Sequence, residues 1–71
     1  GFLVDPQACI ELICIALLHD DDDEAEEHYE NLQEWVNRGG FKPKITNMQY
    51  LALSESFPDI LGYAERNQEQ S

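Results

Sequence analysis

The chain has 71 residues, two cysteines and a formal net charge of −11, from fifteen acidic and four basic side chains. This length corresponds to one small domain with a thin core, and the negative charge argues against direct binding to nucleic acid or to an anionic membrane surface. The longest apolar run, residues 8–18, is interrupted by Glu11 and is shorter than the ~20 residues that span a bilayer, so we expect no membrane segment.

The first predicted helix covers residues 7–19. Asp5 and Pro6 form a start signal, because Asp accepts hydrogen bonds from free N–H groups and Pro at the first helical position has no N–H to leave unpaired. This helix is apolar almost all round, and such a helix needs cover on every side, which a short chain has few elements to supply. We therefore predict that the protein is a homodimer or folds stably only with a partner. The predicted dimer interface is formed by four apolar residues: Ile10, Ile13, Leu17 and Leu53.

The two cysteines of this helix are predicted to be free thiols. Cys9 and Cys14 are separated by about 7.5 Å along a helix axis, at ~1.5 Å per residue, and point to different faces. They therefore form neither a disulfide nor a thiolate zinc site. Buried thiols suit a reducing compartment, and the residues before Asp5 lack the basic stretch of a secretory leader. We expect a cytoplasmic protein.

The second predicted helix covers residues 23–38. Gly39 and Gly40 follow Arg38 and predict a left-handed helix end, with the cation at the negative end of the helix dipole. The core-facing side is predicted from apolar residues that repeat every three or four positions: Ala25, Tyr29, Leu32 and Val36.

A dense acidic segment begins between the two helices and continues along the second. One or two carboxylates suffice to stabilise the start of a helix. Glu26, Glu30 and Glu34, which we call the acidic ladder, repeat at four-residue spacing, and each step costs about 0.2–0.5 kcal/mol in an isolated helix. The ladder therefore serves solubility, as a solvated face, or it meets a partner outside the chain.

Three hypotheses for function follow from this segment. The first is a non-enzymatic interaction module that binds a basic protein surface. The second is a mimic of nucleic-acid phosphates that occupies the groove of a DNA- or RNA-binding enzyme. The third is a divalent-metal-binding protein. Trp35, at the edge of the apolar stripe, fits either the rim of the core or a partner contact. The predicted partner-binding residues are Glu26, Glu30, Glu34, Trp35, Asp21 and Asp22.

Signals for a metal site or for catalysis are weak. The acidic segment lacks the Gly and Glu that an EF-hand loop requires at its sixth and twelfth positions, and His19 and His28 are nine residues apart. Cys14 and His19 point to different sides of one helix, and no glycine-rich phosphate loop or nucleophile motif is present. We expect no metal, no cofactor and no enzymatic activity.

The C-terminal half predicts a connector and one or two further helices. Pro43 lies in an extended connector, and Thr46 or Asn47 caps a helix over residues 48–56, although residues 48–53 also fit a short strand. Pro58 ends or kinks this helix, and residues 58–66 can form another. The predicted fold is all-α: a single domain over residues 1–66, a small bundle of three or four helices, followed by a disordered tail over residues 67–71.

Overall fold

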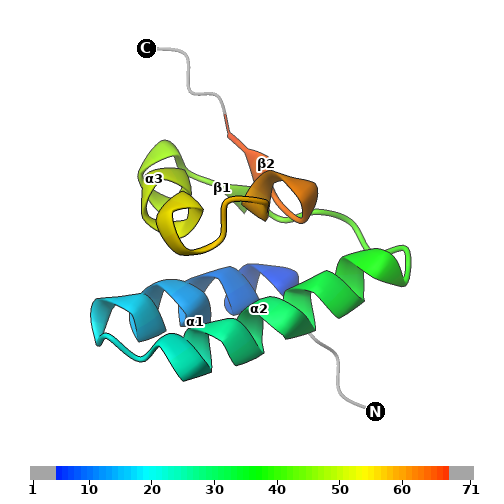
Figure 1. The fold of residues 1–71 in the computed structure, drawn as a ribbon. Coiled ribbons are helices and arrows are strands. Elements are labelled where there is room, and N and C mark those ends of the chain that lie inside the picture. The colour runs from blue at the N-terminus through cyan, green and yellow to red at the C-terminus, as the bar shows by residue number, and fades with distance from the viewer. Residues whose placement is uncertain (1–4, 68–71) are drawn as a thin grey trace.

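The two longest helices form an antiparallel hairpin. In the computed structural model, which describes residues 5–67, α1 covers Pro6–Leu18 and α2 covers Asp22–Asn37. Figure 1 shows the two helices side by side in one layer. The turn between them contains Asp20, whose φ of 59° lies in the left-handed region. The hairpin therefore forms one layer of the fold, and the remaining elements pack on it.

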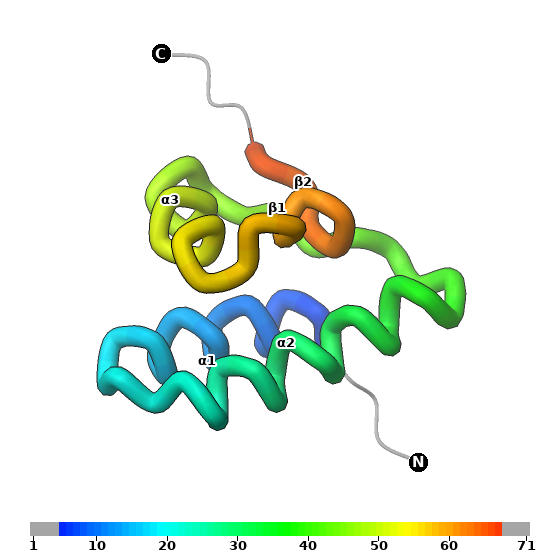
Figure 2. The backbone as a smooth tube through the Cα atoms, in the orientation of Figure 1, coloured from blue at the N-terminus to red at the C-terminus, as the bar shows by residue number. Residues whose placement is uncertain are grey.

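The second layer is a parallel pair of very short strands with a helical crossover. Strand β1, Lys44–Ile45, pairs with β2, Glu65–Arg66. Helix α3, Asn47–Ser56, and the short 3-10 helix η1, Ile60–Gly62, connect the two strands. In Figure 2 the backbone crosses the hairpin in this layer and returns beside β1. Two parallel strands need such a crossover connection, so residues 44–66 form one strand–helix–strand unit.

Each long helix starts at a side-chain cap. The Asp5 carboxylate accepts a hydrogen bond from the Gln7 amide at 3.1 Å, as the sequence predicts. Asp21 accepts from the Glu24 amide at 3.3 Å. Thr46 caps α3, and its capping box satisfies two amides that would otherwise lack partners. The strand alternative for residues 48–53 is therefore wrong.

The predicted left-handed end of α2 is confirmed at Gly39, which has a φ of 100°. The side chain of Trp35 packs over Gly40, the residue after Gly39. Its indole N–H donates a hydrogen bond to the Phe41 carbonyl oxygen at 2.8 Å. The Trp35 and Phe41 rings meet edge to face, with centroids 5.6 Å apart. Trp35 thus fixes the turn that directs the chain from the hairpin into the second layer.

The core lies between the two layers. The predicted stripe of α2 faces it: Ala25, Tyr29 and Leu32 are buried, and Val36 packs against the cluster. From the second layer come five buried apolar residues: Ile45, Leu53, Phe57, Ile60 and Ala64. From α1 come four: Cys9, Ile10, Ile13 and Ala16.

The all-α bundle is only partly correct. The chain is mostly helical, but the second layer contains the two-stranded sheet, which the sequence analysis did not predict. Only η1 forms a helical turn in the predicted helix 58–66. Asn67, the first residue of the predicted tail, donates its amide hydrogen to the Ile45 carbonyl oxygen at 2.7 Å. The rest of that tail lies outside the described residues. Within residues 5–67 no helix has the length and apolar character needed to cross a bilayer.

Three aromatic rings join the hairpin to the second layer. Tyr29 stacks on Phe57 with centroids 4.2 Å apart and meets Tyr63 edge to face at 5.8 Å. Its hydroxyl donates to Asp59 Oδ1 at 3.0 Å. Burial, and then the bond to the carboxylate, raise the pKa of Tyr29 well above its ordinary value.

Tyr29→Phe tests this connection. We expect a loss of about 0.5–1.5 kcal/mol in the free energy of unfolding near neutral pH, because one hydrogen bond is removed. An unfolded tyrosine titrates near pH ~10. Since the native pKa is higher, the unfolded state loses its proton first, and the stability of the wild type falls as pH rises above that value. Urea unfolding between neutral and alkaline pH should show a shallower alkaline loss in the variant; equal slopes would contradict this assignment.

Candidate functional site

The acidic ladder lies on an exposed side of α2. Glu26, Glu30 and Glu34 are all exposed, whereas Ala25 and Leu32 of the same helix are completely buried. Glu34 pairs with Arg38 at 3.1 Å across an exposed surface. Among residues 5–67 no ion pair joins Glu26 or Glu30 to a basic side chain. Two of the three ladder carboxylates therefore remain available to an external cation.

Asp21 and Asp22, at the start of α2, have different roles. Asp21 is the N-cap, so its carboxylate already has a structural partner in the Glu24 amide. Asp22 is the first residue of the helix and is exposed, where its charge interacts favourably with the positive end of the helix dipole. Asp22 thus continues the acidic surface beyond the ladder.

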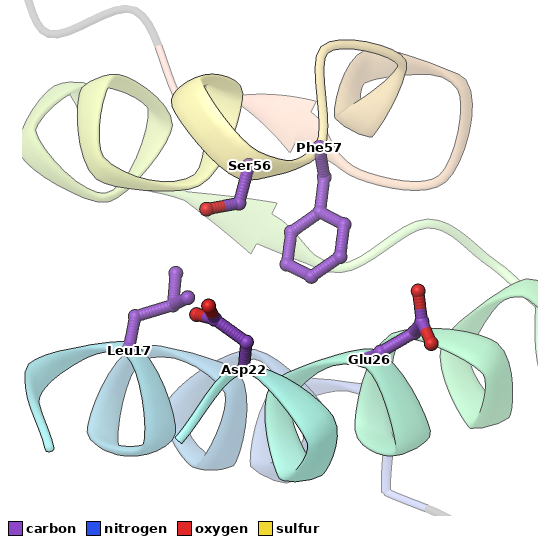
Figure 3. Close-up of a pocket in the computed structure, with 5 residues that line it drawn as sticks. All are labelled: Leu17, Asp22, Glu26, Ser56 and Phe57. Carbon is purple, nitrogen blue, oxygen red and sulfur yellow. The ribbon is translucent and has the colours of Figure 1, made fainter. Parts of the chain in front are cut away.

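A groove adjoins the ladder where the hairpin meets the end of α3. It begins as a hollow of about 290 Å³ lined by two carboxylates, two apolar side chains and one serine. Figure 3 shows Asp22 and Glu26 of α2 on one side of this hollow and Ser56 and Phe57 on the other, with Leu17 of α1 beside Asp22. Glu26 therefore belongs to the ladder and to the groove.

A second hollow, of about 380 Å³, shares Leu17, Asp22 and Ser56 with the first and lengthens it along α3. It adds Asp20 and Glu55. We call the two hollows together the acidic groove. Its apolar lining comes from Cys14, Leu17, Leu18, Ala52 and Phe57, and its acidic lining from Asp20, Asp22, Glu26 and Glu55. Among residues 5–67 no basic side chain lines either hollow, so the groove combines apolar side chains with uncompensated negative charge.

Trp35 is placed at the turn after α2 and not on the ladder. It is half-buried, with its indole N–H bonded to the Phe41 carbonyl oxygen. Its packing over Gly40 gives it a structural role at the rim of the core. As a partner contact it stays a prediction.

The predicted dimer interface needs correction. Ile10, Ile13 and Leu53 have no exposed surface in the single chain. They cannot touch a second copy while this fold persists, because all three are packed inside the core cluster. Leu17 is half-buried and lines the acidic groove. The large apolar residues that α1 leaves exposed are Leu12, Ile15 and Leu18.

Metal-ligating and thiol groups are dispersed in the structure. His28 lies 3.6 Å from Glu24, but residues 5–67 contain no group of three or more His, Cys, Asp or Glu side chains that could hold a metal ion. Cys9 and Cys14 are free. Burial raises the pKa of both thiols, and Asp5 and Glu11 respectively add to the effect. Both thiols therefore stay protonated at neutral pH and act as small apolar groups.

Comparisons with protein-family models, with curated proteins and with solved structures found no match to this chain.

Of the groove residues, only Asp22 and Glu26 were predicted to bind a partner. Ala52, Glu55, Ser56 and Phe57 carry no motif, and they line the groove only because α3 ends above the turn of the hairpin. One sequence feature could have indicated the groove: Asp20 and Asp22 come directly after an apolar helix.

Proposed function

We propose that this chain is a non-enzymatic interaction module that binds a basic segment of a partner protein through the acidic ladder and the acidic groove. The supporting observation is the groove itself, in which apolar side chains and four carboxylates occur together and no basic side chain of residues 5–67 takes part. An acidic face that only keeps the protein soluble needs no apolar hollow beside it. A segment with an apolar side chain next to Lys or Arg would satisfy both parts of the surface.

Charge complementarity supports the same partner class. The net charge of −11 attracts cationic surfaces and raises the rate of encounter with them. The basic groove of a nucleic-acid enzyme is one instance of such a partner, so phosphate mimicry remains a special case of this proposal. We place the protein in the cytoplasm, a location that its two free thiols support.

We also propose that the chain pairs with a second copy. Three large apolar side chains on the outer face of α1 are exposed, which supports an interface there in place of the buried residues that the sequence suggested.

A peptide titration tests the binding surface. The probes are an octalysine and a 14-residue amphipathic peptide of Leu and Lys, measured by calorimetry in 0.15 M salt. We expect Glu26→Gln with Glu30→Gln to weaken octalysine binding about fivefold to tenfold, since each exposed ion pair contributes about 0.2–1 kcal/mol. Raising the salt concentration should also weaken binding of octalysine to the wild type, because salt screens the ion pairs.

The matched control removes the same charge elsewhere. Glu24→Gln with Glu65→Gln replaces two equally exposed carboxylates that already have partners, His28 and Lys44. We expect less than a twofold effect on octalysine binding. Equal losses in the two double variants would show that net charge, and not the ladder, attracts the peptide, and would overturn the proposal.

A further inference from the structure

The outer face of α1 is an apolar surface that the fold leaves uncovered. Leu12, Ile15 and Leu18 are 43%, 52% and 82% exposed. Figure 1 shows α2 beside α1 and the second layer above both helices. The buried apolar residues of α1 belong to the core cluster that these elements share. At ~100° per residue, Glu11 and His19 lie on the same uncovered face as the three apolar residues.

The order of residues on this face is symmetric about Ile15. Ile15 lies midway in the sequence between Leu12 and Leu18, and also midway between Glu11 and His19. In an antiparallel pair of identical helices related by a two-fold axis at Ile15, Leu12 of each copy therefore meets Leu18 of the other. Glu11 of each copy meets His19 of the other. Apolar residues thus meet apolar residues and a carboxylate meets an imidazole in each half of the pair, which is the self-matching pattern that an isologous interface requires.

We infer that two copies of this chain pair through α1 in this antiparallel register, with Ile15 at the axis and Glu11 opposite His19. The inference rests on the pairing proposed above and adds its geometry. The imidazole N–H of His19 can donate a hydrogen bond to the Glu11 carboxylate of the second copy. Because the two copies are related by a two-fold axis, this contact occurs twice in the dimer.

A shallow hollow beside this face can receive a side chain. It measures about 170 Å³, and its walls come from α1 and from the first half of α2. Leu12 lines it, and the register brings Leu18 of the second copy, a largely exposed side chain, over Leu12. The titratable groups that line the hollow are His19, Asp21 at the N-cap of α2, and Glu24 and His28 of α2.

The acidic ladder stays at the periphery in this arrangement. Glu24 and His28 lie on a different side of α2 from Glu26 and Glu30, because successive residues rotate by ~100°. The surface is one face of a 13-residue helix, which is small for a stable interface. We therefore expect a dimer that dissociates in the micromolar range.

Sedimentation equilibrium of the full chain, from low micromolar to several hundred micromolar in 0.15 M salt, tests the pairing. We expect a monomer–dimer equilibrium. Ile15→Glu places two carboxylates together at the axis and should weaken dimerisation at least about tenfold. Met48→Glu is the matched control, since Met48 is an 80% exposed apolar residue on α3, and it should leave the equilibrium within about twofold. Circular dichroism confirms that both variants fold.

A charge swap tests the register. Glu11→His and His19→Glu alone each leave like groups facing one another, and each should weaken the dimer about threefold to tenfold. The double variant restores the pair in reversed order and should return to within about twofold of wild type. A wild type that stays monomeric overturns the pairing itself; a dimer that is insensitive to Ile15→Glu excludes this face; a double variant that fails to recover excludes the register. The peptide titration of the ladder is independent of all three outcomes.

Discussion

Ile13→Ala should lower the free energy of unfolding by about 2–5 kcal/mol, the usual cost of emptying a large buried site. Ile13 has no exposed surface and belongs to the cluster that joins both layers. A chain of this size has a stability of roughly 4–10 kcal/mol, at about 0.05–0.15 kcal/mol per residue. The variant should therefore lose a large fraction of its stability as a single chain.

Urea unfolding at two protein concentrations measures this loss. Leu51→Ala is the control, because Leu51 is 58% exposed on α3 and lies outside the proposed dimer face, and it should cost less than about 1 kcal/mol. A loss for Ile13→Ala that depends on protein concentration, or one no larger than that of Leu51→Ala, would contradict the burial of Ile13 within one chain.

Gly40→Ala is expected to cost about 1–3 kcal/mol, because the added Cβ would overlap with the indole ring of Trp35. The ring cannot move away freely, since its N–H is bonded to the Phe41 carbonyl oxygen and its edge packs on the Phe41 ring. We expect the turn after α2 to open and the emission of Trp35, the only tryptophan in the chain, to shift to longer wavelength.

Gly62→Ala is the control for this substitution. A Cβ at Gly62 meets nothing within 4 Å, and Gly62 has no left-handed φ. The melting temperature and the Trp35 emission of the Gly62→Ala variant should therefore stay close to those of the wild type. Equal stability of the two variants would show that Trp35 does not hold the turn.

Local signals predicted the helices well. The caps at Asp5 and Thr46 and the left-handed end at Gly39 depend only on neighbouring residues, so they can be read from the sequence. The spacing of apolar residues likewise predicted the buried side of α2.

The small sheet could not be predicted in this way. Each strand has two residues, and Lys44 pairs with Glu65, which is distant in the sequence. Alternation over so few positions carries no detectable period. The expected helix over residues 58–66 was wrong for the same reason, because pairing with β1 decides the conformation of its last residues.

The apolar character of α1 on nearly every side misdirected the interface prediction. Periodicity cannot show which face is covered when all faces are apolar, so Ile10 and Ile13 were assigned to an interface instead of to the core. The acidic groove was missed because its walls come from three helices, and only the tertiary arrangement brings Leu17, Glu26 and Ser56 together.

Chemical shift mapping with the Leu–Lys peptide tests the proposed binding surface most directly. In a titration of ¹⁵N-labelled protein at 0.15 M salt, we predict that amide shifts concentrate in the first half of α2, around Asp22 and Glu26, and in the last turn of α3, around Ser56 and Phe57. Octalysine should shift the ladder more than the last turn of α3, because it has no apolar side chain for the groove. Shifts confined to another surface, or absent at saturating peptide, would contradict binding through the acidic ladder and groove.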